Sequence, residues 1–186
     1  ADMITVSAHK IEGPKGVGAL LVDKRIITAK GIVPTVLGGG QEGGYRSGTE
    51  ATPAIFGFAA ACAALNTTFK TDVAKEKALL QEVVTQLSAV DGVIINGAPD
   101  APHILSLSIP GVPTQNTINI LQDHGICVSA GSACAKGHRS HVLEAMGRSA
   151  EVMDGSFRIS LSRHTTQEEL KALTNAIKNE IIDRFK

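Results

Sequence analysis

The sequence predicts a layered α/β fold, and three observations support this prediction. Strand-like and helix-like patterns alternate along the 186 residues. The C-terminal stretch has the spacing of a capped amphipathic helix, with Thr166 three residues before Glu169. Apolar residues make up 43% of the chain and charged residues 19%, which is typical of a globular protein. A chain of this length can bury a core without disulfide bonds or bound metals.

Composition sets aside several classes of function. The 18 basic and 18 acidic side chains balance, and there is no Trp and one Tyr, so nucleic-acid and membrane partners are not expected. No apolar run stands out as long enough to cross a bilayer. The three cysteines, at positions 62, 127 and 134, have no paired spacing, which favours a reducing compartment and a cytoplasmic protein.

The first third of the chain predicts a sheet element followed by helices. Residues 3–7 have a β-branched strand pattern, and residues 17–22 have the continuous apolar pattern of a buried strand. An alanine-rich helix is expected after the glycine-rich loop 38–48, and an amphipathic helix over 71–90. Polar residues separate these two helical patterns at 66–72, where we expect the boundary between two domains.

The remaining chain predicts further strands and helices in alternation. The final helix should bury Leu170, Leu173, Ile177, Ile181 and Phe185. The other expected elements are strands at 92–97, 103–110, 127–131 and 157–162 and helices at 114–125 and 141–147.

Four short stretches carry residue types suited to chemistry. The first is Ser7-Ala8-His9-Lys10 at the end of a strand, where Ser7 and His9 supply donors of the kind that a phosphate needs. A lysine before a Gly-Pro turn is otherwise an ordinary solvated loop residue. The second stretch is GGGQEGGYRSGTE, in which Thr49 stands before a helix, and backbone amides there can bind an anion. The alternative is a loop closed by a helix-capping threonine.

The third stretch is SAGSACAKG, which surrounds Cys134 with small residues. Cys62 and Cys127 fit the pattern of small buried apolar residues, whereas Cys134 does not. A partly exposed thiol in a mobile loop with basic neighbours can ionise and act as a nucleophile. A zinc site of Cys134, His138 and His141 is the alternative, but it lacks a fourth ligand and any CxxC pair. No metal site is therefore predicted.

The fourth stretch is SFRISLS, where Arg158 stands between Phe157 and Ile159 in a strand pattern. Period-two alternation places Arg158 on the face opposite these two apolar residues. Such an arginine either faces solvent or grips a carboxylate through two parallel hydrogen bonds.

In this order the four stretches resemble the pyridoxal-phosphate-dependent cysteine desulfurases of the NifS/IscS type, which are class V aminotransferases. The matching motifs are SAHKIEGPKGVGALLV (7–22), GGGQEGGYRSGTE (38–50), SAGSACAKG (129–137) and SFRISLSRHTT (156–166). The resemblance covers essentially the whole chain. It implies the C-terminal part of a fold-type-I transferase, with residues 1–68 as a remnant of the large cofactor domain and residues 69–186 as the small α/β domain.

The resemblance also implies a role for each candidate residue. Lys10 would carry pyridoxal phosphate as a Schiff base, and Ser7 and His9 would bind its phosphate. Thr49 would reach the cofactor of the other subunit in a homodimer. Arg158 would bind the carboxylate of L-cysteine, and Cys134 would accept its sulfur as a persulfide. That sulfur would pass to an acceptor or an iron–sulfur scaffold protein.

The sequence departs from this family at its beginning. The histidine that stacks on the cofactor ring, the aspartate that pairs with the ring nitrogen and the glycine-rich phosphate turn all precede the lysine motif in the family. We therefore expect a cloned, proteolytic or natural C-terminal half that binds the cofactor weakly and is inactive alone. A non-catalytic docking module, a selenocysteine lyase and a class V aminotransferase remain as alternatives, although transamination needs no thiol.

Overall fold

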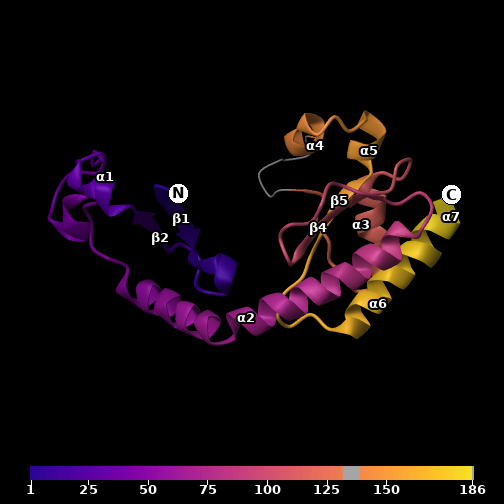
Figure 1. The fold of residues 1–186 in the computed structure, drawn as a ribbon, viewed down its shortest axis with the longest axis horizontal. Coiled ribbons are helices and arrows are strands. Elements are labelled where there is room, and N and C mark those ends of the chain that lie inside the picture. The colour runs from indigo at the N-terminus through magenta and orange to yellow at the C-terminus, as the bar shows by residue number, and fades with distance from the viewer. Residues whose placement is uncertain (132–138, 186) are drawn as a thin grey trace. The chain divides into compact units, whose positions relative to one another are not determined.

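A computed structural model describes residues 1–131 and 139–185 (Figure 1). The chain divides into two compact units, Ala1–Phe69 and Lys70–Lys186. Each unit is described by itself below.

The first unit is built on an antiparallel hairpin. Strand β1 (Met3–Ser7) pairs with strand β2 (Gly18–Val22), in register from Met3 opposite Val22 to Ser7 opposite Gly18. The expected strand at the start of the chain is therefore confirmed. The other elements of this unit are the 3₁₀ turn η1 (Ala8–Ile11), helix α1 (Lys24–Thr28), the 3₁₀ turn η2 (Gln41–Gly44) and the beginning of helix α2 (Thr52–Ser88).

The hairpin exposes apolar side chains on both of its faces. Met3 and Ile4 are 53% and 49% exposed, and Leu20 and Leu21 are 54% and 53% exposed. Successive residues of a strand point to opposite faces, so neither face of this hairpin is covered. The prediction of a buried strand at 17–22 is therefore right about the strand and wrong about its burial in this chain.

Helix α2 runs without interruption from Thr52 to Ser88. The two helices expected on either side of 66–72 are therefore one helix, and the division between the two compact units falls inside this stretch. No Gly or Pro lies in that stretch, and the Thr67 hydroxyl donates to the carbonyl of Ala63, 3.0 Å away on the preceding turn. A threonine bonded in this way remains compatible with a helix.

Helix α2 is also long and apolar enough to span a membrane by length and composition. One 18-residue window reaches a mean hydropathy of 1.2, and none of that window is buried. The expectation that no apolar run is long enough to cross a bilayer is therefore wrong by the criteria of helix length and hydropathy. The finding is weak evidence for a membrane segment, because helices of water-soluble proteins pass the same test.

The second unit contains a three-stranded antiparallel sheet. Its strands are β3 (Ile94–Ile95), β4 (Ile104–Ser108) and β5 (Ser156–Ser160), in that spatial order. Ser106 lies opposite Arg158, and Leu107 lies opposite Phe157. Leu105, Leu107, Phe157 and Ile159 are buried on one face of the sheet.

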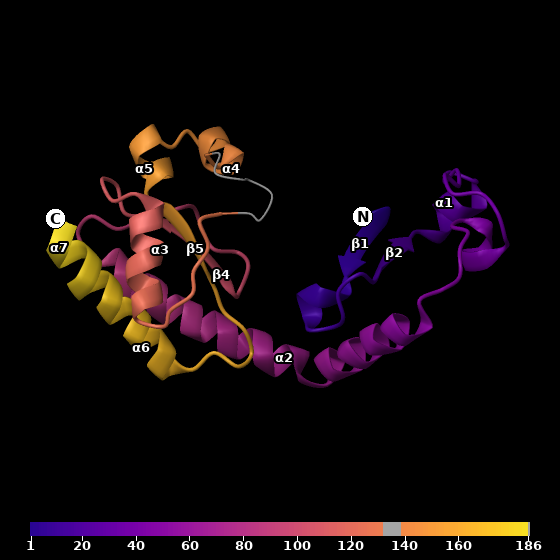
Figure 2. The same cartoon turned by 180° about the vertical axis from the view of Figure 1, so that it is seen from behind.

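Helices cover that apolar face and close the core. The C-terminal half of α2 and helix α6 (Gln167–Ala176) run side by side along the sheet (Figures 1 and 2), and the Gln167 amide donates to both carboxylate oxygens of Glu82 at 3.2 Å. The chain ends in a π-helical turn, η3 (Ile177–Ile182), and helix α7 (Asp183–Phe185). The helical side chains of the core are Leu80, Val83, Leu87, Leu121, Leu170, Leu173, Ala176, Ile177 and Ile181.

The described part of this unit also contains shorter helices. They are α3 (Thr114–Asp123), α4 (His141–Ala145) and α5 (Ala150–Asp154). Both α4 and α5 start at a serine whose hydroxyl accepts a backbone N–H of the first turn, Ser140 and Ser149 respectively.

Local sequence signals are confirmed in several places and wrong in others. The Thr166 hydroxyl and the Glu169 side chain form the predicted reciprocal cap of α6. Phe185 is 45% exposed, against expectation. Cys62 and Cys127 are exposed rather than buried. In place of a strand at 127–131, one isolated bridge joins Ser129 to Arg158.

Candidate functional site

The first group of candidate residues lies where β1 turns into η1. Ala8 is fully buried there, and its N–H donates to the carbonyl of Val17 at 3.1 Å. Its carbonyl accepts the N–H of Gly13 at 2.9 Å. A Cβ at Gly13 would lie 3.0 Å from the Cβ of Ala8, so the turn closes tightly around this alanine. His9 and Lys10 follow it and are exposed.

An open hollow of about 420 Å³ lies beside this turn. Its volume lies within the range of small-molecule sites. Ser7 and His9 contribute to the lining, and Lys10 does not; the remaining lining residues are Thr5, Val6 and 16–20. The lining contains no acidic side chain. The sequence predicts functional side chains at Ser7, His9 and Lys10. The structure brings Ser7 and His9 into the lining of one hollow.

The donors at this turn fit an anionic cofactor such as pyridoxal phosphate. The Ser7 hydroxyl makes no capping bond to η1, and His9 and Lys10 have no ion pair among the described residues. The Ser7 hydroxyl and the His9 imidazole can therefore donate to a phosphate, and the Lys10 amine can react with an aldehyde. No group that would pair with a pyridine nitrogen lines the hollow.

The glycine-rich loop is held by its own polar groups. Ser47 is buried, and its hydroxyl donates to the carbonyl of Gly39 at 2.8 Å. The Arg46 guanidinium donates to the carbonyl of Ser47 at 2.5 Å. Thr49 is exposed and lies before the start of α2 at Thr52, so it does not cap that helix. The structure leaves its hydroxyl available to a ligand or to another chain.

Arg158 lies on the central part of β5 in the second unit. Its neighbours Phe157 and Ile159 are 1% and 3% exposed, so the predicted alternation is confirmed. Its Nε atom is buried and has no hydrogen-bond partner among residues 1–131 and 139–185. A buried guanidinium N–H without an acceptor is costly, and a carboxylate is the ligand that a guanidinium best accommodates.

The sheet face that carries Arg158 is polar, which the sequence reasoning missed. The Asn96 amide donates to the hydroxyl of Ser106 at 3.3 Å and to that of Ser108 at 2.8 Å. The Asn96 Oδ1 atom is buried and unpartnered in the described part of the chain. The alternating serines of ILSLS in β4 were the available signal, since residues two apart share a face.

Cys134 lies in 132–138, outside the described residues, and so does His138 of the alternative zinc site. Within 1–131 and 139–185, no group of three or more His, Cys, Asp or Glu side chains could hold a metal ion. On the N-terminal side of 132–138, the Ser129 N–H donates to the Arg158 carbonyl at 3.0 Å, and the Arg158 N–H donates to the Ser129 carbonyl at 2.7 Å.

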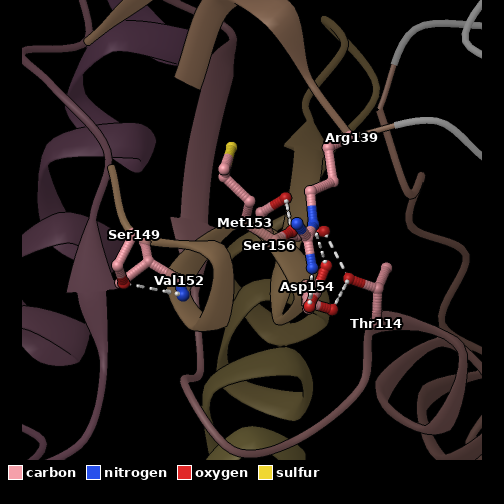
Figure 3. Close-up of polar contacts among 7 residues, drawn as sticks. All are labelled: Thr114, Arg139, Ser149, Val152, Met153, Asp154 and Ser156. Carbon is pink, nitrogen blue, oxygen red and sulfur yellow. Dashed lines mark hydrogen bonds and ion pairs between the residues drawn. The ribbon is translucent and has the colours of Figure 1, made fainter. Parts of the chain in front are cut away.

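On the other side of this segment, Arg139 pairs with Asp154 (Figure 3). Two parallel hydrogen bonds of 2.7 Å join the Nε and Nη2 atoms to the two carboxylate oxygens. The hydrogen bond from Arg139 lowers the pKa of Asp154 below its ordinary value, and Asp154 in turn raises the pKa of Arg139. No motif in the sequence indicated this pair.

Comparisons with known proteins give the family context. The protein family described as "Aminotransferase class-V" matches residues 1–173. The chain is 36% identical over 184 residues to the mitochondrial cysteine desulfurase of Arthroderma benhamiae, covering 97% of this chain and 36% of that protein. It is 38% identical over 173 residues to the cysteine desulfurase IscS of Pseudomonas putida, covering 91% of this chain and 42% of that protein. The chain thus spans less than half the length of these relatives.

Solved structures agree with this similarity. A NifS-like protein from Rickettsia africae matches with a TM-score of 0.84 at 35% identity, over 98% of this chain and 48% of that one. A second NifS-like protein matches with a TM-score of 0.83 at 33% identity, over 99% of this chain and 47% of that one. The apo cysteine desulfurase of Thermococcus onnurineus, at 21% identity and a TM-score of 0.82, shares the fold.

Proposed function

Because the chain belongs to the class V aminotransferase family, we propose that it carries the reactive lysine, the substrate-binding arginine and the sulfur-accepting cysteine of a cysteine desulfurase. The substrate is L-cysteine, and the products are L-alanine and a persulfide on Cys134. The first unit is part of the cofactor domain, and the second is the small domain.

One observation in the second unit carries this proposal. The Arg158 backbone is bonded on both its N–H and its carbonyl to Ser129, which stands five residues before Cys134. The Nε atom of its side chain is buried and lacks a partner within the described part of the chain. The backbone of Arg158, which would bind the substrate carboxylate, is therefore hydrogen-bonded to Ser129, which lies close in sequence to the thiol of Cys134. Desulfuration needs both, because the sulfur leaves the carbon next to the one that bears the amine and the carboxylate.

The first unit supplies the groups for the cofactor. Ser7 and His9 would hold the phosphate of pyridoxal phosphate, and the Lys10 amine would hold its aldehyde group and move the proton at the substrate Cα. When bound, the cofactor withdraws electrons from that carbon. Thr49 contributes its hydroxyl to the phosphate site of a second subunit in a homodimer.

The chain's residues then divide the reaction between them. Arg158 orients L-cysteine through its carboxylate. Cys134 attacks as the thiolate, so that the substrate C–S bond breaks and a new S–S bond forms on the enzyme. The former Cβ takes up a proton, and L-alanine leaves. The persulfide sulfur passes to an acceptor or iron–sulfur scaffold protein, and the exposed thiols of Cys62 and Cys127 suit a reducing compartment such as the cytoplasm.

The test uses the complete natural polypeptide that contains these residues, loaded with pyridoxal phosphate and given L-cysteine. We expect sulfide release and a persulfide on the Cys134 peptide by mass spectrometry. Cys134→Ser should abolish both, whereas Cys127→Ser, a matched change at an exposed thiol, should leave them unchanged. Sulfide release by Cys134→Ser at the original rate would refute the assignment of the sulfur acceptor.

A second measurement addresses Lys10 in this chain alone. We expect the chain to bind pyridoxal phosphate weakly, because no group in the hollow pairs with the ring nitrogen. Borohydride reduction at high cofactor concentration should label Lys10 in preference to Lys15, with Lys15→Arg as the control. Equal labelling of the two lysines would count against a specific site at Lys10.

A further inference from the structure

Asn96, Ser106 and Arg158 form one row across the sheet of the second unit. In the register of β3 and β4, Ile95 lies opposite Leu107. Asn96 continues this register, because its N–H donates to the carbonyl of Ser106 at 2.9 Å. On the other side, Ser106 lies directly opposite Arg158 in the register of β4 and β5. Opposite residues of adjacent strands share a face, so all three side chains stand on the polar face of this sheet.

The side chains of Ser106 and Arg158 are close neighbours in this row. The backbone N–H and carbonyl of Arg158 are both bonded to Ser129, on the side away from β4. Ser106 and Arg158 therefore form a non-hydrogen-bonded pair, in which the Cα atoms of an antiparallel ladder are only about 4.5 Å apart. At this spacing a serine hydroxyl can reach the Nε atom of the arginine. The buried Nε atom nevertheless has no acceptor within 1–131 and 139–185, Ser106 included.

The Asn96 side chain explains why the Ser106 hydroxyl does not accept this N–H. The Asn96 amide donates to the hydroxyl oxygen of Ser106 at 3.3 Å and to that of Ser108 at 2.8 Å. A serine side chain turns about one bond between staggered positions, so a hydroxyl directed toward β3 is not directed toward β5 at the same time. Asn96 therefore holds the Ser106 hydroxyl on the β3 side of the row.

We propose that Asn96 is a positioning residue, which holds the Ser106 hydroxyl away from Arg158 and so keeps the guanidinium available to a substrate carboxylate. The inference rests on the proposed function, because the carboxylate in question is that of L-cysteine. An arginine that is already bonded inside the protein must give up that bond before it can bind a ligand in its place. Loss of the Asn96 amide should therefore weaken carboxylate binding about fivefold, the equivalent of one typical net hydrogen bond.

Nuclear magnetic resonance of the isotope-labelled chain tests the first step of this argument without cofactor or substrate. In Asn96→Ala, the proton resonance of the Arg158 Nε–H should move downfield, because the Ser106 hydroxyl becomes its acceptor. Asn96→Ala combined with Ser106→Ala should return the resonance to its original position. The matched control is Asn96→Ala with Ser108→Ala, which should keep the downfield shift because Ser108 lies opposite Ser156.

A second substitution keeps the test decisive if Asn96→Ala does not fold. Asn96→Val also removes the amide, and its β-branched side chain suits an extended strand. It should shift the Arg158 resonance in the same direction. An unmoved resonance in the folded Asn96 variants would overturn the proposal. No return in the double variant with Ser106→Ala, or a return in the control with Ser108→Ala, would overturn it as well.

The complete natural polypeptide gives a kinetic readout of the same effect. Asn96→Ala should raise KM for L-cysteine about fivefold and leave kcat close to its original value, since it weakens binding of the carboxylate before and during the reaction alike. Adding Ser106→Ala should lower KM again, and an unchanged KM in Asn96→Ala would contradict the proposal. The resonance measurements need no L-cysteine, so their failure is distinguishable from failure of the desulfurase assignment, which the sulfide assay tests.

Discussion

Thr117 and Arg158 both contain buried polar atoms without a partner in the described structure, in different surroundings. Arg158 lies on the polar face of the sheet beside the segment that bears the proposed nucleophile. Thr117 is completely buried on α3, whose Leu121 belongs to the apolar core. An unsatisfied donor at a ligand site can be satisfied by the ligand, whereas in a core it only lowers stability. The unpartnered Nε atom of Arg158 therefore supports a functional role, whereas the unpartnered hydroxyl of Thr117 predicts a loss of stability.

Thr117→Val should stabilise the second unit. The change keeps the β-branched shape and removes a buried hydroxyl that has no partner among the described residues, so we expect a gain of about 1 kcal/mol in the free energy of unfolding. Urea denaturation monitored by circular dichroism measures it. Thr174→Val is the matched control, because that buried hydroxyl donates to the carbonyl of Lys171 at 3.1 Å. A gain in the control as large as that in Thr117→Val would contradict the argument.

The Arg139–Asp154 pair predicts a defined pH dependence. The hydrogen bond from Arg139 lowers the pKa of Asp154 in the folded protein. The pKa of Arg139 is raised mainly by Asp154 and to a smaller extent by the charge of Glu144. A carboxyl with a lowered pKa stabilises the fold above the pKa of the unfolded chain and loses this effect as pH falls through the folded value. The pair should therefore be intact between pH 5 and 8 and break only below about pH 3.9, the ordinary aspartate value.

Carboxyl carbon chemical shifts followed by NMR through an acid titration test this expectation. Arg139→Gln should return the midpoint of Asp154 to the ordinary aspartate range. The pKa of Asp23 is lowered in the same way by Arg25. It should be unaffected by Arg139→Gln and serves as the internal reference. A midpoint of Asp154 that does not respond to Arg139→Gln would show that the ion pair is absent in solution.

At the scale of elements, the junction between α5 and β5 depends on a glycine. A Cβ at Gly155 would lie 2.2 Å from the carbonyl oxygen of Ile109, which is backbone that cannot rotate away. The N–H of Ile109 donates to the carbonyl of Gly155 at 3.0 Å, so β4 and β5 meet closely at this point. Gly155 thus links Asp154, at the end of α5, to β5, which contains Arg158.

Gly155→Ala should destabilise this junction by about 1–3 kcal/mol, in the range of overpacking substitutions. The expected readouts are a lower urea midpoint and faster amide hydrogen exchange along β5. Gly40→Ala is the control, because a Cβ there meets nothing within 4 Å and φ is −85°. Equal midpoints for the two variants would mean that the contact relaxes without cost.

At the scale of the whole molecule, the two units differ in how much they bury. In the first unit, only Ala8 and Ser47 are buried, and apolar side chains such as Met3 and Leu20 are exposed on the hairpin. The second unit contains the whole cluster of buried apolar side chains. Because apolar burial is the main source of stability, the second unit should be the more stable of the two.

Limited proteolysis at low protease concentration should therefore cut first within residues 1–69 and leave a resistant fragment that begins near Lys70. Mass spectrometry of the products identifies the cleavage sites. Leu107→Ala, which removes a fully buried side chain of the core, should remove the protection of that fragment, while Leu20→Ala should not. Initial cleavage inside the sheet of the second unit would contradict this order of stability.

The sequence by itself determined the features that depend on neighbours along the chain. A β-branched pattern identified β1, and alternation placed Arg158 on the face opposite Phe157 and Ile159. The spacing of Thr166 and Glu169 located the start of α6. The four ordered motifs also indicated the family. These signals are readable because capping, pleating and short motifs act over a few residues.

Only the tertiary structure decided the features that join distant residues. Arg139 and Asp154 stand 15 residues apart, and Asn96 stands 12 residues from Ser108, with no pattern to pair them. Burial likewise depends on what covers an element, so the apolar pattern of β2 predicted a buried strand that this chain leaves exposed. Local periodicity states which face is apolar, whereas the packing of remote segments decides whether that face meets protein or water.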